Sequence, residues 1–509
     1  MSNRSQGPEK PPRSGRVLLV AALIILLVVT SASGLYIYQV LKPAGEPSSG
    51  RASCADPLGG AKVLTTQLPP PTTIGGVTEF ALPTPIRAPS TPVVAPDGSV
   101  WFAEESVPGL AHFFPGNRTL VEYAWPFGYT TPPSPGGLCG QKTSTWGILL
   151  RDGEVWATDT SGNQLVEFDP STGATSTYKV PASSAFPYTL TAGPNGSLWF
   201  TELFTGELGV LSQNGTLRQY PVPGGANAEP SQVIFVNSTS GYYSAVWANL
   251  IDGGGVYSFN TTRFAPVLLG GEHLTDPNSL TIASGALWVA LHGSSSVASY
   301  NFTTKAWSFY PTTPIAWADT TLPYWVQVNG SSVWFNEHYA NRMALIDPAS
   351  GSLTEYSESA GPVNGSTIGN AVTMGVGGGR AWFAELTGNV LGYVSASYTP
   401  GFYTSIAGNS TVVVDRGSSA TVDLVVHDTA HQGGLNLSFA DSEGYSSTPT
   451  NITYSVPSTS VSPPMGGELT VPVTVSALQS LKPGTYTAIL TATDGLTYES
   501  SFLRIVVPP

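Results

Sequence analysis

Charged residues are scarce in this 509-residue chain: Asp, Glu, Lys and Arg together make up 10% of it, against roughly 25% in an average soluble domain. Basic residues are the rarer kind, and the net charge of −13 argues against nucleic acid as a partner. Only 2 cysteines are present and no histidine lies near either, which argues against a cysteine-ligated metal or a cysteine nucleophile. The 56 glycines and 43 prolines leave little room for long helices, so we expect an all-β protein.

A degenerate repeat fills residues 77–398. Its anchor is a tryptophan at the end of an apolar pair or triplet, and it recurs at intervals of 41 to 55 residues at Trp101, Trp156, Trp199, Trp247, Trp288, Trp334 and Trp382. A period in the forties is typical of a propeller, a helical solenoid or a tandem array. Within one period, short runs rich in Val, Leu, Tyr and Phe alternate with hairpin turns such as Asn195-Gly196 and Asn214-Gly215.

The unit around Trp199 shows how one period is built. Its sequence predicts four strands, at residues 188–192, 197–202, 207–212 and 216–222. Four antiparallel strands in about forty residues form a propeller blade. We therefore predict an all-β fold in which residues 75–398 form a seven-bladed β-propeller.

Both ends of the repeat array are incomplete. Residues 76–83 look like the fourth strand of a blade, but no first three strands precede them, and the last unit, residues 373–394, lacks a fourth strand. Pairing the two would close the ring and leave no open edge between the first and last blades. We therefore predict that residues 77–82 form the outermost strand of the blade that contains Trp382.

Residues 193–202 read GPNGSLWFTE and are followed by a strand, a turn and the ending YPVP at residues 220–223. Units of this form resemble those of the streptogramin (virginiamycin B) lyase family, over roughly residues 75–398. The resemblance implies a seven-bladed propeller and, in the lyases, an elimination that opens a cyclic depsipeptide with a divalent metal, usually Mg. Many relatives carry the repeats alone, so the repeat indicates the propeller type and not the reaction.

The resemblance also implies where catalytic residues would lie. In the lyases, catalytic histidines follow a proline that opens the first strand of a blade, about eleven residues before the tryptophan. The matching positions here hold no histidine: Ser90, Tyr188, Asn278, Tyr324 and Asn370. Elimination needs a base that takes the proton alpha to the carbonyl. The departure therefore argues against the family's reaction, unless His338 or His292 supplies the base.

A ring of acids could supply the metal ligands that the resemblance implies. Three residues after five of the seven tryptophans comes a carboxylate: Glu104, Asp159, Glu202, Glu337 and Glu385. One position further, in adjacent blades, come His292 and His338, whereas His112 and His273 have no repeat partner and are expected at the surface. Oxygen ligands with one or two imidazoles could hold Mg or Ca, with Glu104, Glu202, Glu337 and Glu385 as the candidate ligands. The alternative is that the acid is a structural signature that bonds backbone amides of the neighbouring blade.

The N-terminus has the pattern of a membrane anchor. Residues 1–16 form a basic tail, expected in the cytoplasm, and residues 17–41 are an uncharged run long enough at ~1.5 Å per residue to cross a ~30 Å hydrocarbon core. A cleaved signal peptide is the alternative, but Tyr36 and Tyr38 extend the run with interfacial aromatics and favour the anchor. Residues 42–74 are expected to be a Pro/Gly/Ser-rich spacer, which predicts a single-pass protein of the cell membrane with its bulk outside the cytoplasm.

Export has consequences for two residue types. Cys54 and Cys139 are expected to pair as a disulfide more readily than to remain free thiols. Sequons make eleven asparagines candidates for glycosylation: Asn117, Asn195, Asn214, Asn237, Asn260, Asn301, Asn329, Asn364, Asn409, Asn436 and Asn451. The alternative is that Asn-Gly turns followed by Ser or Thr arise from hairpin chemistry alone.

Seven of the eight propeller sequons fall at the end of the ring called the bottom, so we expect a ligand at the opposite end, the top.

Residues 402–509 have a different pattern. They contain about seven short strand-like runs and no tryptophan, which is typical of a β-sandwich. Residues 481–486, LKPGTY, resemble the tyrosine corner of immunoglobulin-like domains, with Tyr486 as the tyrosine. We expect an immunoglobulin-like module that carries no chemistry of its own.

Two functions remain. The first is a membrane-anchored surface protein whose propeller top binds a peptide, a glycan or a small molecule. The second is a lyase-like enzyme with an altered site, in which His338 or His292 is the base and the glutamates hold Mg or Ca. The absence of histidine at the strand-opening positions favours the first.

Overall fold

The computed structural model describes residues 63–509 except 84–87, 105–108, 125–144, 161, 238–239, 246–253, 261–262, 270–275, 316–320, 359–370, 387, 432 and 442–450. The predicted tail and anchor, both cysteines, His273, Asn364 and Asn370 therefore lie outside the described residues. Within the described ranges no helix is long and apolar enough to cross a membrane.

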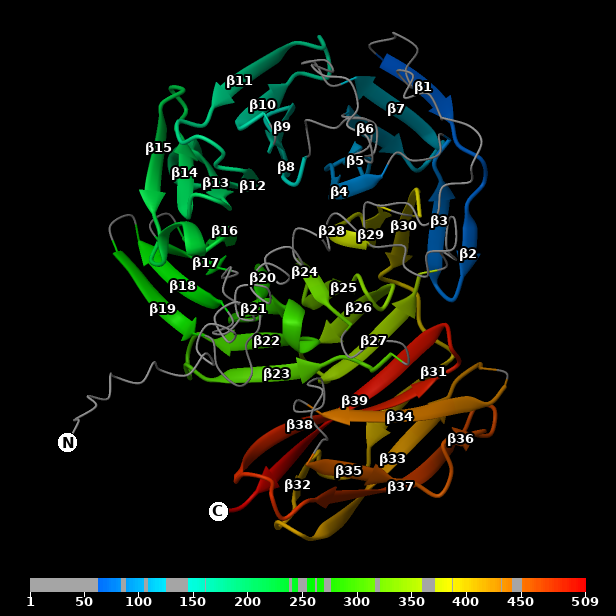
Figure 1. The fold of residues 1–509 in the computed structure, drawn as a ribbon. Coiled ribbons are helices and arrows are strands. Elements are labelled where there is room, and N and C mark those ends of the chain that lie inside the picture. The colour runs from blue at the N-terminus through cyan, green and yellow to red at the C-terminus, as the bar shows by residue number, and fades with distance from the viewer. Residues whose placement is uncertain are drawn as a thin grey trace, which may run out of the picture.

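Seven sheets stand around a common axis (Figure 1), and each begins with an inner strand. Each inner strand contacts the next around the ring and the last contacts the first: β4 (Pro89–Val94), β8 (Ile148–Arg151), β12 (Pro187–Ala192), β16 (Pro230–Phe235), β20 (Pro277–Ala283), β24 (Pro323–Asn329) and β28 (Ala371–Gly377). Because this cycle closes after seven members, the predicted seven-bladed propeller is confirmed. We number the blades 1 to 7 in that order.

Every blade adds three antiparallel strands outside its inner strand. The second strands are β5 (Val100–Glu104), β9 (Glu154–Asp159), β13 (Leu198–Glu202), β17 (Ser240–Ala245), β21 (Ala286–Leu291), β25 (Ser332–Glu337) and β29 (Arg380–Glu385). The third strands are β6 (Gly109–Phe114), β10 (Gln164–Phe168), β14 (Glu207–Leu211), β18 (Gly255–Asn260), β22 (Ser296–Asn301), β26 (Arg342–Asp347) and β30 (Val390–Ser395). The fourth strands are β7 (Thr119–Ala124), β11 (Thr175–Lys179), β15 (Leu217–Pro221), β19 (Arg263–Leu269), β23 (Trp307–Pro311), β27 (Ser352–Ser357) and, for blade 7, β3 (Val77–Ala81). Among the residues that the structure describes, three short 3₁₀ turns lie between strands: η1 (Pro194–Gly196), η2 (Gly225–Asn227) and η3 (His292–Ser294).

Apolar side chains of the second strands fill the space between blades. In blade 3 all five residues of β13 are buried, and Trp199 stacks on Tyr220 of its own blade at 5.7 Å and meets Phe235 of blade 4 edge-on at 5.1 Å. Phe200 lies against Gly209, where an added Cβ would come within 2.0 Å of the ring, so this strand-to-strand approach requires glycine. The six repeat tryptophans in the described ranges are all buried, as expected of packing residues.

Blade 4 departs from the predicted repeat. Its inner-strand Pro230 lies opposite Ala245, as Pro187 of blade 3 lies opposite Glu202. Counting back from these pairs, Tyr242 occupies the place of Trp199. The prediction that Trp247 anchors this blade is therefore wrong: the second strand ends at Ala245, and Trp247 lies outside the described residues.

At least one side-chain hydrogen bond crosses each of the seven junctions between neighbouring blades, with an inner-strand residue on at least one side. From blade 1 onward these run from Thr91 Oγ1 to Trp146 O (3.4 Å), Thr158 Oγ1 to Tyr188 O (3.2 Å), Thr189 Oγ1 to Ser231 O (2.8 Å), Leu280 N to Gln232 Oε1 (2.5 Å), Val326 N to Ser279 Oγ (2.6 Å), Val376 N to Gln327 Oε1 (3.0 Å) and Thr91 N to Thr373 Oγ1 (2.7 Å). These bonds satisfy backbone groups that the sheets themselves leave unpaired, so the inner strands are joined into a continuous belt.

The predicted closure is confirmed. β3 pairs antiparallel with β30, from Val77 opposite Val394 to Ala81 opposite Val390. The N-terminal segment goes further than predicted: β2 (Thr72–Ile74) pairs outside β3, and β1 (Val63–Gln67) pairs outside β7. The last part of the expected spacer therefore consists of strands on the two blades that meet at the closure.

The C-terminal residues form two sheets around a core that includes Leu424, Val473 and Ile505. One sheet contains β31 (Phe402–Ile406), β33 (Ser419–Asp428), β37 (Glu468–Ala477) and β35 (Ile452–Ser455), and the other contains β32 (Thr411–Val413), β39 (Thr497–Val507), β38 (Gly484–Thr493), β34 (Leu435–Asp441) and β36 (Ser460–Val461). Tyr486 donates its hydroxyl to Lys482 O at 2.7 Å, a bond of the kind that a tyrosine corner makes. An immunoglobulin-like identity stays a prediction.

The C-terminal sandwich is joined to the propeller by strand pairing. β39 pairs antiparallel with β27, the outer strand of blade 6, so one sheet runs from the ring into the sandwich (Figure 1). The sequence did not predict this junction, and the sandwich is a continuation of blade 6.

Most of the predicted glycosylation asparagines that the structure describes are exposed. Ten are described: eight are exposed and two, Asn329 and Asn451, are half-buried. In four, the side-chain Oδ1 accepts the backbone N–H of the Ser or Thr two positions on, as in the 3.1 Å bond from Thr216 N to Asn214. Such a bond is expected if these sequons arise from hairpin turn chemistry alone. Attachment of sugar stays a prediction.

Phe80 on the closing strand provides a test of the closure. It is buried between Phe113 of blade 1 at 4.8 Å and Trp382 of blade 7 at 6.4 Å. We expect Phe80→Ala to lower the free energy of unfolding by about 3–5 kcal/mol in urea denaturation. Val63→Ala, at a side chain that is 48% exposed on β1, should change it by less than about 0.5 kcal/mol. Equal effects of the two substitutions would contradict the closure role.

Candidate functional site

The inner strands carry a recurrent irregularity where they begin. The register against the second strand shifts between Pro187 and Leu190, and the same shift follows Pro277 and Pro323. A bulge of this kind redirects a side chain and is frequent beside functional sites. The residues within the shifts are those at the strand-opening positions, among them Tyr188, Asn278 and Tyr324.

Two of these residues meet across the axis. The hydroxyls of Tyr188 in blade 3 and Tyr324 in blade 6 are 2.5 Å apart. Because blades 3 and 6 are not neighbours in the ring, this bond must span the axis. Asn278 of blade 5 also bonds Tyr324 and accepts the hydroxyl of Ser231 at 2.5 Å. Strand-opening side chains of four blades are thus linked at one end of the ring, which is the end predicted as the top.

The two predicted catalytic histidines are brought together beside this bond. His292 Nε2 and His338 Nε2 are 2.9 Å apart, and the two rings are parallel within 4°. Tyr324 meets both imidazoles edge-on, at 5.3 and 5.4 Å. We call Trp146, Tyr188, Tyr324, His292 and His338 the axial cluster, since Trp146 of blade 2 packs on Tyr188 at 5.6 Å.

His292, Tyr188 and Tyr324 of the axial cluster are uncharged at neutral pH. Burial and the neighbouring His338 hold the pKa of His292 well below its usual value. Burial raises the pKa of Tyr188 and of Tyr324 above the usual value, so both phenols keep their protons. One imidazole must donate and the other accept in the 2.9 Å contact, since two protonated rings would repel.

Aromatic side chains continue from the cluster to the surface of blade 3. Phe186 lies 6.4 Å from Tyr188, and Phe204 lies 4.6 Å from Phe186. Tyr188 is buried, Phe186 is half-buried and Phe204 is 51% exposed, so exposure rises outward along this row. The row and the cluster together give an apolar surface with hydroxyl and imidazole groups at its inner end.

The four glutamates predicted as metal ligands lie elsewhere. Each ends a second strand in a different blade and is buried within that blade. Glu202 accepts Gln219 Nε2 at 2.6 Å and Thr205 Oγ1 at 3.0 Å. Over the ranges that the structure describes, which include all four, no three His, Cys, Asp or Glu side chains converge as a metal site. The predicted ring of ligands is therefore not seen among these residues, and Glu202 instead bonds Gln219 on the fourth strand of its own blade.

The surroundings of three of these glutamates raise their pKa values. Burial raises the pKa of Glu202 to about 7, partly offset by the bonds from Thr205 and Gln219. Burial and nearby Glu355 raise the pKa of Glu337 well above its usual value, against the opposing effect of Arg342. Burial and Glu79 raise that of Glu385. The bonds to Glu202 come from side chains of the same blade and not from backbone amides of the neighbouring blade. A structural role for the whole ring of acids stays a prediction.

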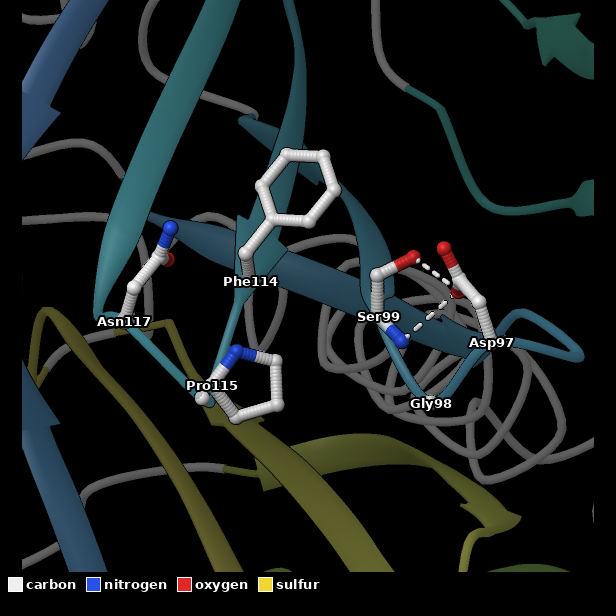
Figure 2. Close-up of a pocket in the computed structure, with 7 residues that line it drawn as sticks. Asp97, Gly98, Ser99, Phe114, Pro115 and Asn117 are labelled. Carbon is white, nitrogen blue, oxygen red and sulfur yellow. Dashed lines mark hydrogen bonds between the residues drawn. The ribbon is translucent and has the colours of Figure 1, made fainter.

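A hollow of about 360 Å³ opens at the other end of blade 1, lined by Asp97, Gly98, Ser99, Phe114, Pro115, Gly116 and Asn117 (Figure 2). Asp97 Oδ1 accepts Ser99 N at 2.9 Å and Ser99 Oγ at 2.6 Å. His112, expected at the surface, is instead stacked on Trp101 at 4.0 Å, bonded to Ser99 Oγ at 2.7 Å, and has its pKa lowered by burial to about 4. These contacts close a turn, and we place the functional site at the axial cluster.

The ring, its closing strand and its inner-strand bulges define a seven-bladed β-propeller. The virginiamycin B lyase family model matches residues 139–261. A virginiamycin B lyase of Nocardia farcinica is 29% identical over 140 residues, which are 28% of this chain and 43% of that protein. The propeller is therefore virginiamycin B lyase-like, and the aligned segment spans less than half the length of that relative.

Solved structures agree on the fold. A streptogramin B lyase structure superposes with a TM-score of 0.52 at 21% identity, covering 62% of this chain and 96% of that one. Virginiamycin B lyase from Staphylococcus aureus superposes with the same TM-score at 18% identity, covering 63% of this chain and 98% of the other.

Sequence reasoning found part of this site. Their shared spacing of four residues after Trp288 and Trp334 predicted that His292 and His338 lie at one end of adjacent blades, and the structure brings them into contact. Tyr188 and Tyr324 were noted only because histidine was absent, and Trp146 was not noted. A signal was available: a tyrosine directly after a strand-opening proline occurs in blades 3 and 6 and nowhere else in the repeat.

The low pKa of His292 gives a pH prediction. The unfolded chain binds a proton there near pH 6.5, whereas the folded chain does so only at lower pH, so folding stability should fall as pH falls below about 6.5. We expect His292→Gln to flatten the slope of unfolding free energy between pH 7 and pH 5. Met465→Ala, at a side chain that is 70% exposed on the sandwich and does not titrate, is the control and should keep the wild-type slope. An unchanged slope in His292→Gln would show that this imidazole is not held neutral by folding.

Proposed function

We propose that this protein is a membrane-anchored, extracytoplasmic binding protein whose axial cluster receives an uncharged ligand with an apolar ring, such as a neutral peptide or small molecule. The anchor is the uncharged run at residues 17–41, by its sequence. The observation that carries the binding role is the Tyr188–Tyr324 bond beside the His292–His338 pair, which assembles polar groups of several blades on one aromatic surface.

Charge decides the class of ligand. His292 and Tyr188 are uncharged at neutral pH because burial shifts their pKa values away from it, and the carboxylates predicted for the top are buried inside their own blades. A charged ligand would lose its hydration here without gaining a counter-charge from these groups. An uncharged ring gains stacking area on Phe204 and Phe186 and brings no charge that needs a partner.

Lyase chemistry is not the function that the geometry supports best. Elimination needs a base with a free lone pair, and here Nε2 of each histidine faces Nε2 of the other at 2.9 Å. Strand-opening positions that hold histidine in the lyases hold Tyr188, Asn278 and Tyr324. We therefore expect virginiamycin B incubated with the full chain to remain cyclic by chromatography, and ring opening would restore the enzymatic hypothesis.

A matched set of probes tests the binding proposal. N-acetylphenylalanine amide is neutral, N-acetylphenylalanine is an anion and phenylalanine amide is a cation, with the same ring in all three. We expect the neutral probe to bind the full chain at least ~10-fold more tightly than either charged probe, which corresponds to about 1.4 kcal/mol. Titration followed by tryptophan and tyrosine fluorescence measures the three affinities. Equal affinities, or a preference for a charged probe or a neutral oligosaccharide, would contradict the assignment.

Phe204 is the residue to change for this test. Its ring is 51% exposed, so Phe204→Ala should leave the free energy of unfolding within about 0.5 kcal/mol of wild type. The same change should weaken binding of the neutral probe several-fold, since it removes the outer stacking surface. Met465→Ala, at a side chain that is 70% exposed on the sandwich, is the control and should leave binding unchanged.

A further inference from the structure

A buried arginine connects the C-terminal sandwich to blade 6. The guanidinium carbon of Arg342 on β26 lies 3.8 Å from the ring centre of Tyr498 on β39. Arg342 Nη1 donates to Thr313 O at 2.9 Å and lies 3.5 Å from Glu355 Oε1. The side chains of Arg342 and Glu355 are 4% and 0% exposed, so this cation is held inside the joint and not on its rim. A desolvated cation over an aromatic face is among the stronger contacts of this type.

From this arginine the chain of contacts runs to His338. Arg342 is the cross-strand partner of Glu337, which directly precedes His338. The Glu337 carboxyl is fully buried, and Arg342 is the cation that acts on it. Moving the guanidinium would change the packing around this buried carboxyl at the end of β25. His338 is attached to that end.

A second path reaches both histidines through Thr321. Thr313 O accepts from Arg342, and Thr313 N donates to Glu355 Oε1 at 2.9 Å. The next residue back along the chain, Thr312, has its hydroxyl oxygen 2.6 Å from that of Thr321. Thr321 N donates to Ser295 Oγ at 2.9 Å, three residues after His292. Thr321 O accepts Tyr339 N at 3.2 Å, one residue after His338. One threonine therefore supports the segments that carry both imidazoles.

We infer that Arg342 and Tyr498 are positioning residues for the His292–His338 pair, so that the sandwich is a structural part of the axial site. Neither side chain belongs to the axial cluster. Tyr498 fixes the guanidinium, the guanidinium fixes Glu337 and Thr313, and these two fix the histidine segments. The consequence for binding rests on the proposed function, whereas the positioning itself can be measured without a ligand.

The test uses the full chain labelled with ¹⁵N at its 6 histidines. An imidazole pair that shares one proton between Nε2 atoms gives ¹⁵N shifts distinct from those of solvent-exposed neutral rings, and His292→Gln and His338→Gln assign the two signals. We expect Tyr498→Leu to move both signals toward exposed-imidazole values and to weaken the neutral probe at least ~10-fold. Tyr498→Phe keeps the ring face under the guanidinium and should retain both properties. Tyr403→Leu, at a 45%-exposed tyrosine of the same sandwich, is the matched control and should also retain them.

The outcomes separate the two proposals. If Tyr498→Leu is folded and its histidine signals match wild type, the positioning role is wrong. If the signals move but the neutral probe binds neither wild type nor variant, the positioning role stands and the proposed function fails. If Tyr498→Leu does not fold, Arg342→Lys decides, because lysine keeps the charge but loses the planar stack and the fork of donors. Histidine signals that are unchanged in a folded Arg342→Lys would overturn the inference.

Discussion

The belt of hydrogen bonds between inner strands is the constraint on which the rest of the structure depends. A blade by itself is a small sheet with two apolar faces, and it is stable only when both faces are covered by neighbours. The bonds at each junction, such as Thr91 N to Thr373 Oγ1 between the last and first blades, set the angle and height at which those faces meet. The opening residues of the inner strands are thereby held at one level, where Tyr188 and Tyr324 can meet across the axis.

That arrangement explains why polar groups can be buried at the centre of an all-β ring. An isolated phenol or imidazole in such a place would lose its hydration without replacement. Here each finds a partner from another blade, as Tyr188 finds Tyr324 and His292 finds His338. The site is therefore built from contacts between blades that are distant in sequence, and its geometry depends on all seven blades being present.

Local sequence predicted the parts of this protein that are governed by local rules. The four strands around Trp199 followed from alternating apolar residues and Asn-Gly turns, and the closing strand followed from counting strands at the two ends of the array. The Tyr188–Tyr324 contact could not be predicted in this way, because it depends on a bulge and on the diameter of the closed ring. Trp247 was misassigned since blade 4 has a tyrosine, Tyr242, at the anchor position. The pairing of β27 with β39 was missed because an alternating strand fits either of two sheets equally well.

The path of the N-terminal segment has a mechanical consequence. The chain enters on the edge of blade 1 as β1, crosses to the edge of blade 7 as β2, turns back as β3 and only then begins blade 1. A pull on the N-terminus must first detach the five residue pairs of β1 from β7 and the three pairs of β2 from β3 before it loads the strand that closes the ring. Tension would be dissipated in two outer ladders whose loss leaves the seven-bladed ring intact, so the ring could keep its shape while the chain leading to it is under load.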